Sequence, residues 1–338
     1  MKIISQPITV NHLKIKNRLV MPPMATAKSA PEGSVSPELC EYYKERALHS
    51  HIGMIITEHS YINIQGKAGR HQLSMASDDV LKDMRTLTDT IHETDVKIMA
   101  QINHAGSRAE TEVTGCESVG PSALIHPNSG KNPLSIPHEL TKEEIKGIVS
   151  DFAQAARRAK EAGFDGVEIH SAHGYLLNQF YSPLTNKRQD EYSVDIMENR
   201  TRFHVEVIRA VRKIVGDSYP VAIRLGGCDY REGGSTIEDC VKACQIFEKE
   251  GVDFLDITGG LFGYIRPGHT EPGYFKEMSK AVKEAVTIPV LLTGGVKTIG
   301  AATELLEEGS GDLIGVGRAI FKDARWADKE EGVIFNND

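Results

Sequence analysis

The 338-residue sequence lacks any hydrophobic run long enough to span a membrane, which takes about 18 consecutive apolar residues. Residues 1–11 mix polar and apolar side chains and lack the apolar core of a signal peptide. Surplus positive charge is also absent, because the formal net charge is −8. The composition therefore argues against nucleic acids and anionic membranes as partners and predicts a soluble, cytoplasmic protein.

Cysteine is scarce, and its spacing does not suggest pairs. An odd count of five without a Cys-x-x-Cys motif predicts reduced thiols, as expected in the cytoplasm. Cys240 and Cys244 are one helical turn apart, but no histidine or further cysteine lies nearby to complete a zinc set. We expect both to be buried on a helix face and predict no metal site.

The sequence does contain a regular alternation of short apolar runs and amphipathic stretches. This alternation is typical of an α/β fold with parallel strands, and several runs are continuously apolar, as in strands covered on both faces. Helix starts are expected at Ser36, Thr141, Ser235 and Thr298. We predict one domain over residues 1–338, a TIM (β/α)8 barrel with extended βα loops. The eight expected strands are Leu19–Met24, Met54–His59, Lys97–Asn103, Gly166–His170, Pro220–Leu225, Phe254–Thr258, Pro289–Thr293 and Leu313–Gly317.

The chain is longer than the roughly 250 residues that a bare barrel of this kind needs. The surplus falls mostly in residues 104–140, 171–196 and 259–273, which follow the third, fourth and sixth expected strands. Connections after strands lie on the C-terminal face of such a barrel, where ligands bind. The lengths of the loops therefore predict a site on this rim.

One segment offers a compact set of polar side chains. His170-Ser171-Ala172-His173-Gly174-Tyr175 follows the apolar run of the fourth strand. If the chain turns after His170, the imidazoles of His170 and His173 can converge, with the phenol of Tyr175 close by. Such a set supplies hydrogen-bond donors and a possible proton source. The alternative is a loop that happens to carry unrelated polar residues.

Glycine-rich turns follow the last two strands. Thr293-Gly294-Gly295 and Gly315-Val316-Gly317-Arg318 occupy the usual phosphate site of a TIM barrel, and Arg318 adds a guanidinium that can bind phosphate with two hydrogen bonds. Without side chains, backbone N–H groups can approach an anion closely. The alternative is that these glycines only form tight turns. Gly315-x-Gly317 lacks the third glycine of a dinucleotide fingerprint.

Polar side chains also interrupt the apolar strands. Gln101 and Arg224 need partners when buried, since an unpaired polar group in the interior is costly. Two interpretations of Arg224 remain open: an internal pair with Asp256 or Glu168, or contact with a ligand that carries planar acceptors. For Glu58, Glu168 and Asp256 we expect ion pairs inside the barrel.

Together these residues resemble the old yellow enzyme family of FMN-dependent ene-reductases, NADH:flavin oxidoreductases that include the barrel of 2,4-dienoyl-CoA reductase-like enzymes. The resemblance covers nearly the whole chain. The motifs that carry it are Asn17–Met24, Gln101-Ile102-x-His104-Ala105-Gly106, His170-x-x-His173-Gly174-Tyr175, Phe180–Tyr192, Glu198-Asn199-Arg200, Arg224, Thr293-Gly294-Gly295 and Gly317-Arg318.

The resemblance implies FMN across the barrel mouth, NADH or NADPH as electron donor, and hydride transfer to an α,β-unsaturated carbonyl substrate. It implies that His170 and His173 bind the carbonyl oxygen and that Tyr175 protonates the α-carbon. From the third long loop, we expect Tyr264 to contact the substrate. The expected cofactor contacts are Pro22, Pro23, Met24, Ala25 and His59 near the isoalloxazine, Gln101 and Arg224 at its pyrimidine side, and Gly294, Gly295, Gly317 and Arg318 at the phosphate.

The sequence departs from the family pattern at two positions and in its cysteine content. Ala25 stands where many members have threonine or cysteine, and His59 stands where a small residue is common. Because no iron–sulfur cysteine cluster follows the barrel, we expect electrons directly from a nicotinamide nucleotide, with a homo-oligomer as a possible assembly. Three alternatives remain: a barrel fed by a separate redox partner, a non-redox phosphate-binding barrel enzyme, and a binding protein without turnover.

Overall fold

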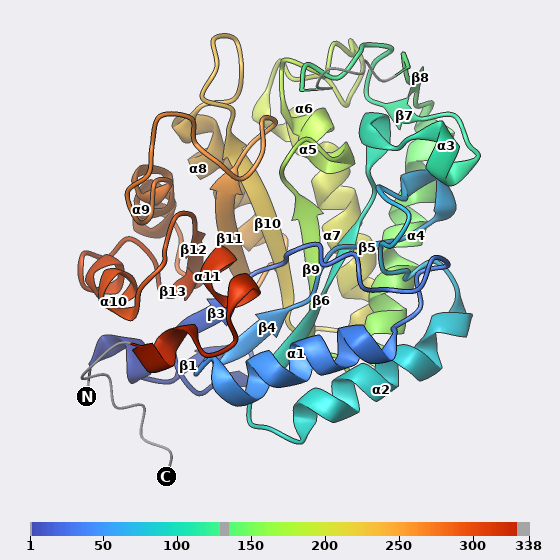
Figure 1. Cartoon of the computed structure of the whole chain (residues 1–338). Helices are drawn as coiled ribbons and strands as arrows, with labels where there is room; N and C mark the ends of the chain where they lie inside the picture. Colours follow the sequence, from blue (N-terminus) through green and yellow to red (C-terminus); the bar gives the residue numbers. More distant parts are fainter. Residues whose placement is uncertain (1, 129–134, 330–338) are drawn as a thin grey trace.

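A computed structural model describes residues 2–128 and 135–329 (Figure 1). Eight parallel strands pair in the closed order β3, β4, β6, β9, β10, β11, β12, β13, and β13 returns to β3. The predicted TIM barrel is confirmed. The barrel strands are β3 (Leu19–Met21), β4 (Met54–Ile56), β6 (Lys97–Asn103), β9 (Gly166–Ser171), β10 (Val221–Cys228), β11 (Phe254–Gly259), β12 (Val290–Thr293) and β13 (Leu313–Gly315).

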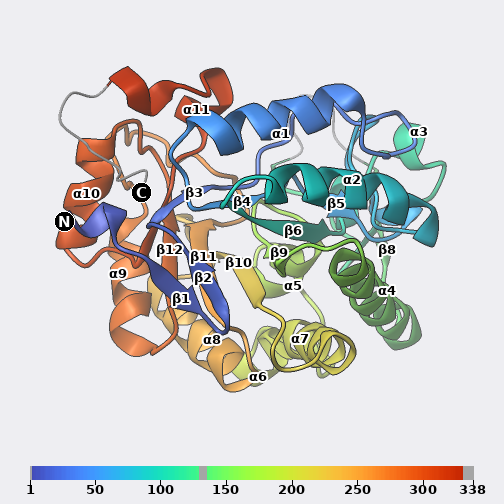
Figure 2. The ribbon, with the colours of Figure 1, turned by 90° about the horizontal axis from the view of Figure 1, so that it is seen from below.

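Helices surround the ring of strands (Figures 1 and 2). The longer ones are α1 (Pro37–His49), α2 (Leu81–His92), α4 (Lys142–Glu161), α7 (Arg202–Val215), α8 (Ile237–Lys249), α9 (Lys276–Ala285) and α10 (Ile299–Glu307). The short ones are α3 (Thr111–Thr114), α5 (Leu176–Tyr181), α6 (Met197–Arg200), α11 (Arg318–Lys322) and the 3-10 turns η1 (Ile3–Ser5), η2 (Ile64–Gly66), η3 (Asp78–Val80), η4 (Gly106–Arg108) and η5 (Trp326–Lys329).

Three of the four expected helix starts are N-caps. The side chains of Ser36, Thr141 and Thr298 each accept a backbone N–H of the first turn, and Thr141 forms a capping box. The prediction for Ser235 was wrong by one residue, because Thr236 caps α8 while the Ser235 hydroxyl donates to Asp229. In α8, Cys240 and Cys244 are both fully buried, as expected.

Several strand ends differ from the prediction. Strand β3 ends at Met21 because Pro22 and Pro23 have no N–H to donate to a ladder. Strand β4 ends at Ile56, so the segment that carries His59 is loop rather than strand. In the other direction, β10 continues to Cys228.

A hairpin at the N-terminal end of the barrel was not expected. Strands β1 (Ile8–Val10) and β2 (Leu13–Ile15) pair antiparallel and cross the bottom of the barrel in Figure 2. Their apolar side chains close the interior from below, leaving the C-terminal mouth as the open end. This inner core consists of Val10, Leu13, Ile15, Val20, Met54, Ile56, Met99, Ala222, Phe254, Leu291 and Leu313.

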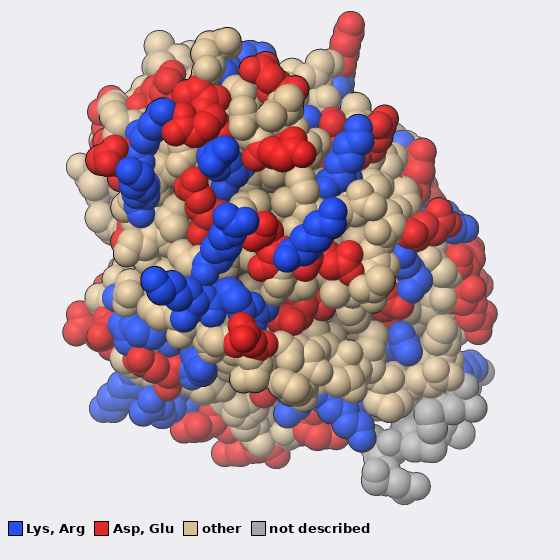
Figure 3. Space-filling model, turned by 180° about the vertical axis from the view of Figure 1, so that it is seen from behind, with Lys and Arg blue, Asp and Glu red and all other residues tan. Residues whose placement is uncertain are grey.

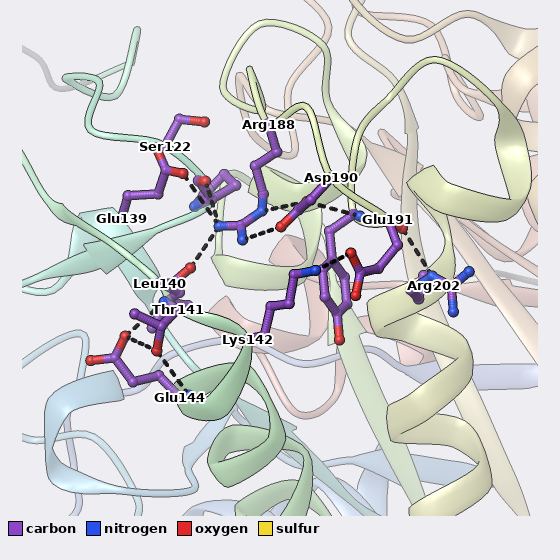
Figure 4. A network of polar contacts seen from close by, with 12 residues as sticks. Ser122, Glu139, Leu140, Thr141, Lys142, Glu144, Arg188, Asp190, Glu191 and Arg202 are labelled. Atoms are coloured by element: carbon purple, nitrogen blue, oxygen red, sulfur yellow. Dashed lines mark hydrogen bonds and ion pairs between the residues drawn. The ribbon is translucent and has the colours of Figure 1, made fainter.

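The long loops on the rim are held by a polar network (Figure 4). The buried guanidinium of Arg188 donates to the carbonyls of Leu140 at 2.6 Å and Pro121 at 3.2 Å and pairs with Asp190 at 2.7 Å. It thereby joins the loop after β9 to the loop after β6, whose residues 129–134 lie outside the described residues. Short strands β5 (Ser60–Tyr61), β7 (Val119–Gly120) and β8 (His138–Glu139) complete this rim.

Charged side chains of both signs are distributed over the surface, as the similar numbers of basic and acidic residues suggest. On the face shown in Figure 3, lysine and arginine side chains lie among aspartates and glutamates. Within residues 2–128 and 135–329, no helix is both long and apolar enough to cross a bilayer. The same residues contain no cluster of three or more side chains suited to hold a metal ion.

Candidate active site

A cavity of about 610 Å³ opens at the C-terminal ends of the strands. Residues from β6, β9, β10, β11 and β12 reach it, as do the loops after β3 and β4. Every residue predicted for the site lines this cavity. They are Pro22, Pro23, Met24, Ala25, His59, Gln101, His170, His173, Tyr175, Arg224, Tyr264, Gly294, Gly295, Gly317 and Arg318.

The turn after β9 brings the two imidazoles and the phenol together. The ring centroid of His170 lies 5.2 Å from that of His173 and 5.2 Å from that of Tyr175. His173 has a left-handed backbone with φ 58°, and Gly174 follows with φ 77°. A Cβ on Gly174 would lie 2.7 Å from the His126 ring and 2.8 Å from the Leu261 carbonyl, so the turn requires glycine.

Burial, neighbouring cations and neighbouring imidazoles set the protonation of these groups. Desolvation lowers the pKa of His170 and of His173 well below the ordinary value, and the charge of Arg224 lowers both further. Desolvation raises the pKa of the Tyr175 phenol. At neutral pH the cluster therefore holds two neutral imidazoles, each with one N–H, and one protonated phenol.

The structure shows the internal pair of Arg224 with Asp256, and contact with a ligand stays a prediction. The Nε of Arg224 lies 3.0 Å from Oδ2 of Asp256, and its guanidinium also lines the cavity. The expected ion pair of Asp256 is therefore present. The expectation for Glu168 was wrong, because its carboxylate accepts from Gln101 Nε2 at 2.8 Å, and burial raises its pKa well above the usual range.

Glu58 also has a different role from the one expected. Its carboxylate accepts the backbone N–H of Thr26 at 2.9 Å and forms no ion pair within 4.0 Å among the described residues. Burial raises its pKa to about 7. Glu58 therefore positions the loop after β3, which lines the cavity, without supplying a permanent charge there.

Close packing requires glycine in the turn after β12, which also lines the cavity. A Cβ on Gly295, which has φ 71°, would lie 2.7 Å from the Glu271 carbonyl and from the Tyr274 ring. Arg318 lines the same cavity and donates to the Tyr274 hydroxyl at 3.3 Å, and this hydroxyl also hydrogen-bonds with the Gly295 backbone. A guanidinium that lines the cavity next to a glycine turn suits a phosphate.

The donor set fits FMN. Oε1 of Gln101 and Nδ1 of His170 are buried without a hydrogen-bond partner among the described residues. Buried polar atoms of this kind need a polar ligand to satisfy them. A planar ring with alternating donors and acceptors, joined to a phosphate, matches the side chains at one end and the glycines with Arg318 at the other.

Several residues that line the cavity were not predicted from the sequence, among them Arg108, Thr258 and Tyr274. The hydroxyl of Thr258 lies 3.2 Å from Nε2 of His173, and Tyr274 connects Arg318 to the third long loop by donating to the Tyr264 carbonyl at 2.7 Å. Thr258 offered a signal, since it is a polar residue at an expected strand end. Tyr274 lies just beyond the loop and offered none, because only the folded loop brings its ring to the glycines.

Comparison with known proteins gives a consistent assignment. A model of the family described as NADH:flavin oxidoreductase / NADH oxidase matches residues 4–335. The NADPH dehydrogenase of Clostridium acetobutylicum is 36% identical over 322 residues, covering 94% of this chain and 91% of that protein. The solved old yellow enzyme homologue from Zymomonas mobilis is 28% identical, with a TM-score of 0.82, and covers 94% of this chain and 89% of that chain.

A longer relative shows that the barrel also occurs within larger proteins. The NADH oxidase of Thermoanaerobacter brockii is 36% identical over 326 residues, which cover 95% of this chain and 49% of that protein. The chain thus spans about half the length of this relative, and its sequence is similar to that of the stand-alone NADPH dehydrogenase over nearly the full length of both.

Proposed function

The chain belongs to the NADH:flavin oxidoreductase / NADH oxidase family, the family of old yellow enzyme, and we propose that it reduces the C=C bond of α,β-unsaturated carbonyl compounds with NADH or NADPH. The observation that carries this proposal is the arrangement of the cavity. Two neutral imidazoles and a protonated phenol converge in it, and Gly294, Gly295, Gly317 and Arg318 line the same cavity.

The cofactor of this proposal is FMN, as in the family. Gln101 and Arg224 would hold its pyrimidine side, residues 22–25 the edge of its ring, and Gly294, Gly295, Gly317 and Arg318 its phosphate. When bound, FMN supplies the acceptor and donor of hydride between the nicotinamide nucleotide and the alkene. The protein supplies binding, orientation and polarisation.

His170 and His173 donate hydrogen bonds to the carbonyl oxygen of the substrate. Hydride addition to the β-carbon moves negative charge onto this oxygen, and N–H groups held in place stabilise that charge as it develops. Thr258 orients His173 through the 3.2 Å contact at Nε2. Because both rings are neutral, they stabilise the oxygen as hydrogen-bond donors, with the proton remaining on the ring.

Tyr175 donates the proton to the α-carbon. Its phenol remains protonated at neutral pH because burial raises its pKa. The ring lies beside His170, so the proton source and the carbonyl site are parts of one cluster. This separation of roles assigns polarisation to the histidines and protonation to the tyrosine.

Replacing Tyr175 with phenylalanine tests the division of roles. We expect Tyr175→Phe to reduce the rate of alkene reduction by 100-fold or more, on the order expected for loss of a general acid. Reduction of the flavin by NADPH should remain within about twofold of the wild-type rate, since it needs no protonated carbon. Anaerobic stopped-flow measurement of the two half-reactions separates these rates.

The matched control is Tyr230→Phe, which removes a phenol that lies outside this cavity. It should leave both half-reactions unchanged. Equal rates of alkene reduction in the wild type and Tyr175→Phe would show that Tyr175 is not the proton donor.

A second function is favoured by one observation, the match to about half of a longer NADH oxidase. In this alternative the barrel receives electrons from a separate redox unit. Direct reduction of the purified FMN-loaded chain by NADH or NADPH would contradict it, while a flavin that neither nucleotide reduces would support it.

A further inference from the structure

His59 lines the cavity beside the residues proposed to bind and protonate the substrate. It follows β4 in a loop, and its ring centroid is 5.3 Å from that of Tyr175 and 6.2 Å from that of His170. The cavity therefore contains a third imidazole, next to the proposed proton donor Tyr175 and near the two histidines proposed to bind the substrate carbonyl.

The tautomer of His59 follows from a chain of hydrogen bonds. Oε1 of Gln72 accepts the backbone N–H of Ala68 at 2.5 Å, which fixes the orientation of the Gln72 amide. Its Nε2 then faces Nδ1 of His59 at 2.7 Å and the His59 carbonyl at 3.2 Å. Because an amide NH2 can only donate, Nδ1 must accept, and the proton of the neutral ring lies on Nε2.

The imidazole of His59 is neutral at working pH. Burial lowers its pKa to about 4, and the charge of Arg224 contributes to the shift. Nε2 has no hydrogen-bond partner among the described residues, although the ring lines the cavity. His59 thus presents one oriented N–H donor that neither the internal packing nor the proposed mechanism uses.

The position of this donor relative to the cluster suggests its partner. A substrate with its carbonyl at His170 and His173 and its α-carbon at Tyr175 extends past the Tyr175 ring toward His59. We propose that His59 is a specificity-determining residue that donates a hydrogen bond to a second acceptor on the alkene. The preferred substrates are then doubly activated alkenes, such as cyclic enediones and maleimides. This inference rests on the proposed function.

A pair of substrates that differ by one carbonyl tests the inference. The pair is 4-cyclopentene-1,3-dione and 2-cyclopenten-1-one, compared by kcat/KM in the wild type and in His59→Phe. We expect His59→Phe to lower the ratio of kcat/KM for the dione to kcat/KM for the mono-ketone about tenfold, as for loss of one hydrogen bond to the second carbonyl. Because kcat/KM for the dione is divided by kcat/KM for the mono-ketone in each protein, the intrinsic reactivity of the dione cancels when wild type and variant are compared.

A second variant and a second readout make the test independent of folding problems. His59→Gln keeps an N–H donor and should recover part of the preference for the dione. Long-range ¹H–¹⁵N correlation spectra of the histidine-labelled protein should show His59 protonated at Nε2 at pH 7. The His59 signal is identified by its loss in the variants.

The outcomes separate this inference from the function on which it rests. Turnover of both compounds with an equal loss in His59→Phe, or with no loss, overturns the role of His59 alone. A proton on Nδ1 or a charged ring at pH 7 also overturns it. Failure of the wild-type, FMN-loaded protein to reduce either compound overturns the proposed function and the inference with it.

Discussion

The histidines of the barrel illustrate how burial sets the chemistry of single residues. His59, His170 and His173 lie in one cavity near the cation of Arg224, and burial is the largest cause that keeps each of them neutral. Outside the proposed mechanism, burial lowers the pKa of His104 and of His204 to about 3. A neutral imidazole donates a hydrogen bond without adding charge, which suits polarisation of a carbonyl.

The buried histidines predict a loss of stability in acid. A ring with a folded-state pKa of about 3, as for His204, binds no proton while the unfolded chain takes one up near pH 6.5. The contribution of these histidines to the free energy of unfolding should therefore be constant above about pH 7.5 and fall as the pH drops from 6.5 toward 4. Chemical denaturation across this range measures the fall.

The variant His204→Gln should lower the slope of the free energy of unfolding against pH in this range by roughly 1.4 kcal/mol per pH unit. This is the slope that uptake of one proton on unfolding produces. Replacement of the solvent-exposed His12 is the matched control. An unchanged slope in His204→Gln would contradict the assignment of a buried neutral imidazole at this position.

At the scale of elements, strand cores and helix starts could be predicted from the sequence, because each depends on residues that are close together in the chain. Continuous apolar runs predicted the core of each barrel strand, and the Ser36 and Thr141 caps predicted helix starts because a cap acts within one turn. The end of β3 could also have been read from Pro22 and Pro23. The β1–β2 hairpin could not, since each strand has three residues and gains its stability from the barrel interior.

The Arg188 network is the element-scale feature that we expect to hold the rim. Arg188→Ala removes a buried charge-assisted donor from the Leu140 and Pro121 carbonyls and leaves Asp190 without its cation. We expect the free energy of unfolding to fall by about 3 kcal/mol, as for a buried charged hydrogen-bonding group. Urea denaturation measures this loss.

The matched control comes from the same network. Lys142 pairs with Glu191 near the surface in Figure 4, so Lys142→Ala should cost less than about 1 kcal/mol. Equal effects of the two substitutions would show that the network contributes nothing beyond an exposed ion pair.

At the scale of the molecule, the site is assembled from strands far apart in sequence. Gln101, His170, Arg224 and Thr258 come from β6, β9, β10 and β11, and the barrel order makes these strands neighbours. Once the sequence predicted a barrel, it also predicted that its strand ends converge on one face. The position of Tyr274 was not predictable in this way, because it depends on how the loop after β11 folds back.

The proposed function requires that this chain alone accepts electrons from a nicotinamide nucleotide and passes them to an activated alkene. The visible spectrum of the purified, FMN-loaded chain tests it most directly, recorded anaerobically with NADPH, with NADH and then with 2-cyclohexen-1-one. We predict that the flavin absorbance near about 455 nm bleaches with at least one nucleotide and returns when the enone is added. A flavin that stays oxidised with both nucleotides, or stays reduced after the enone, would contradict the account.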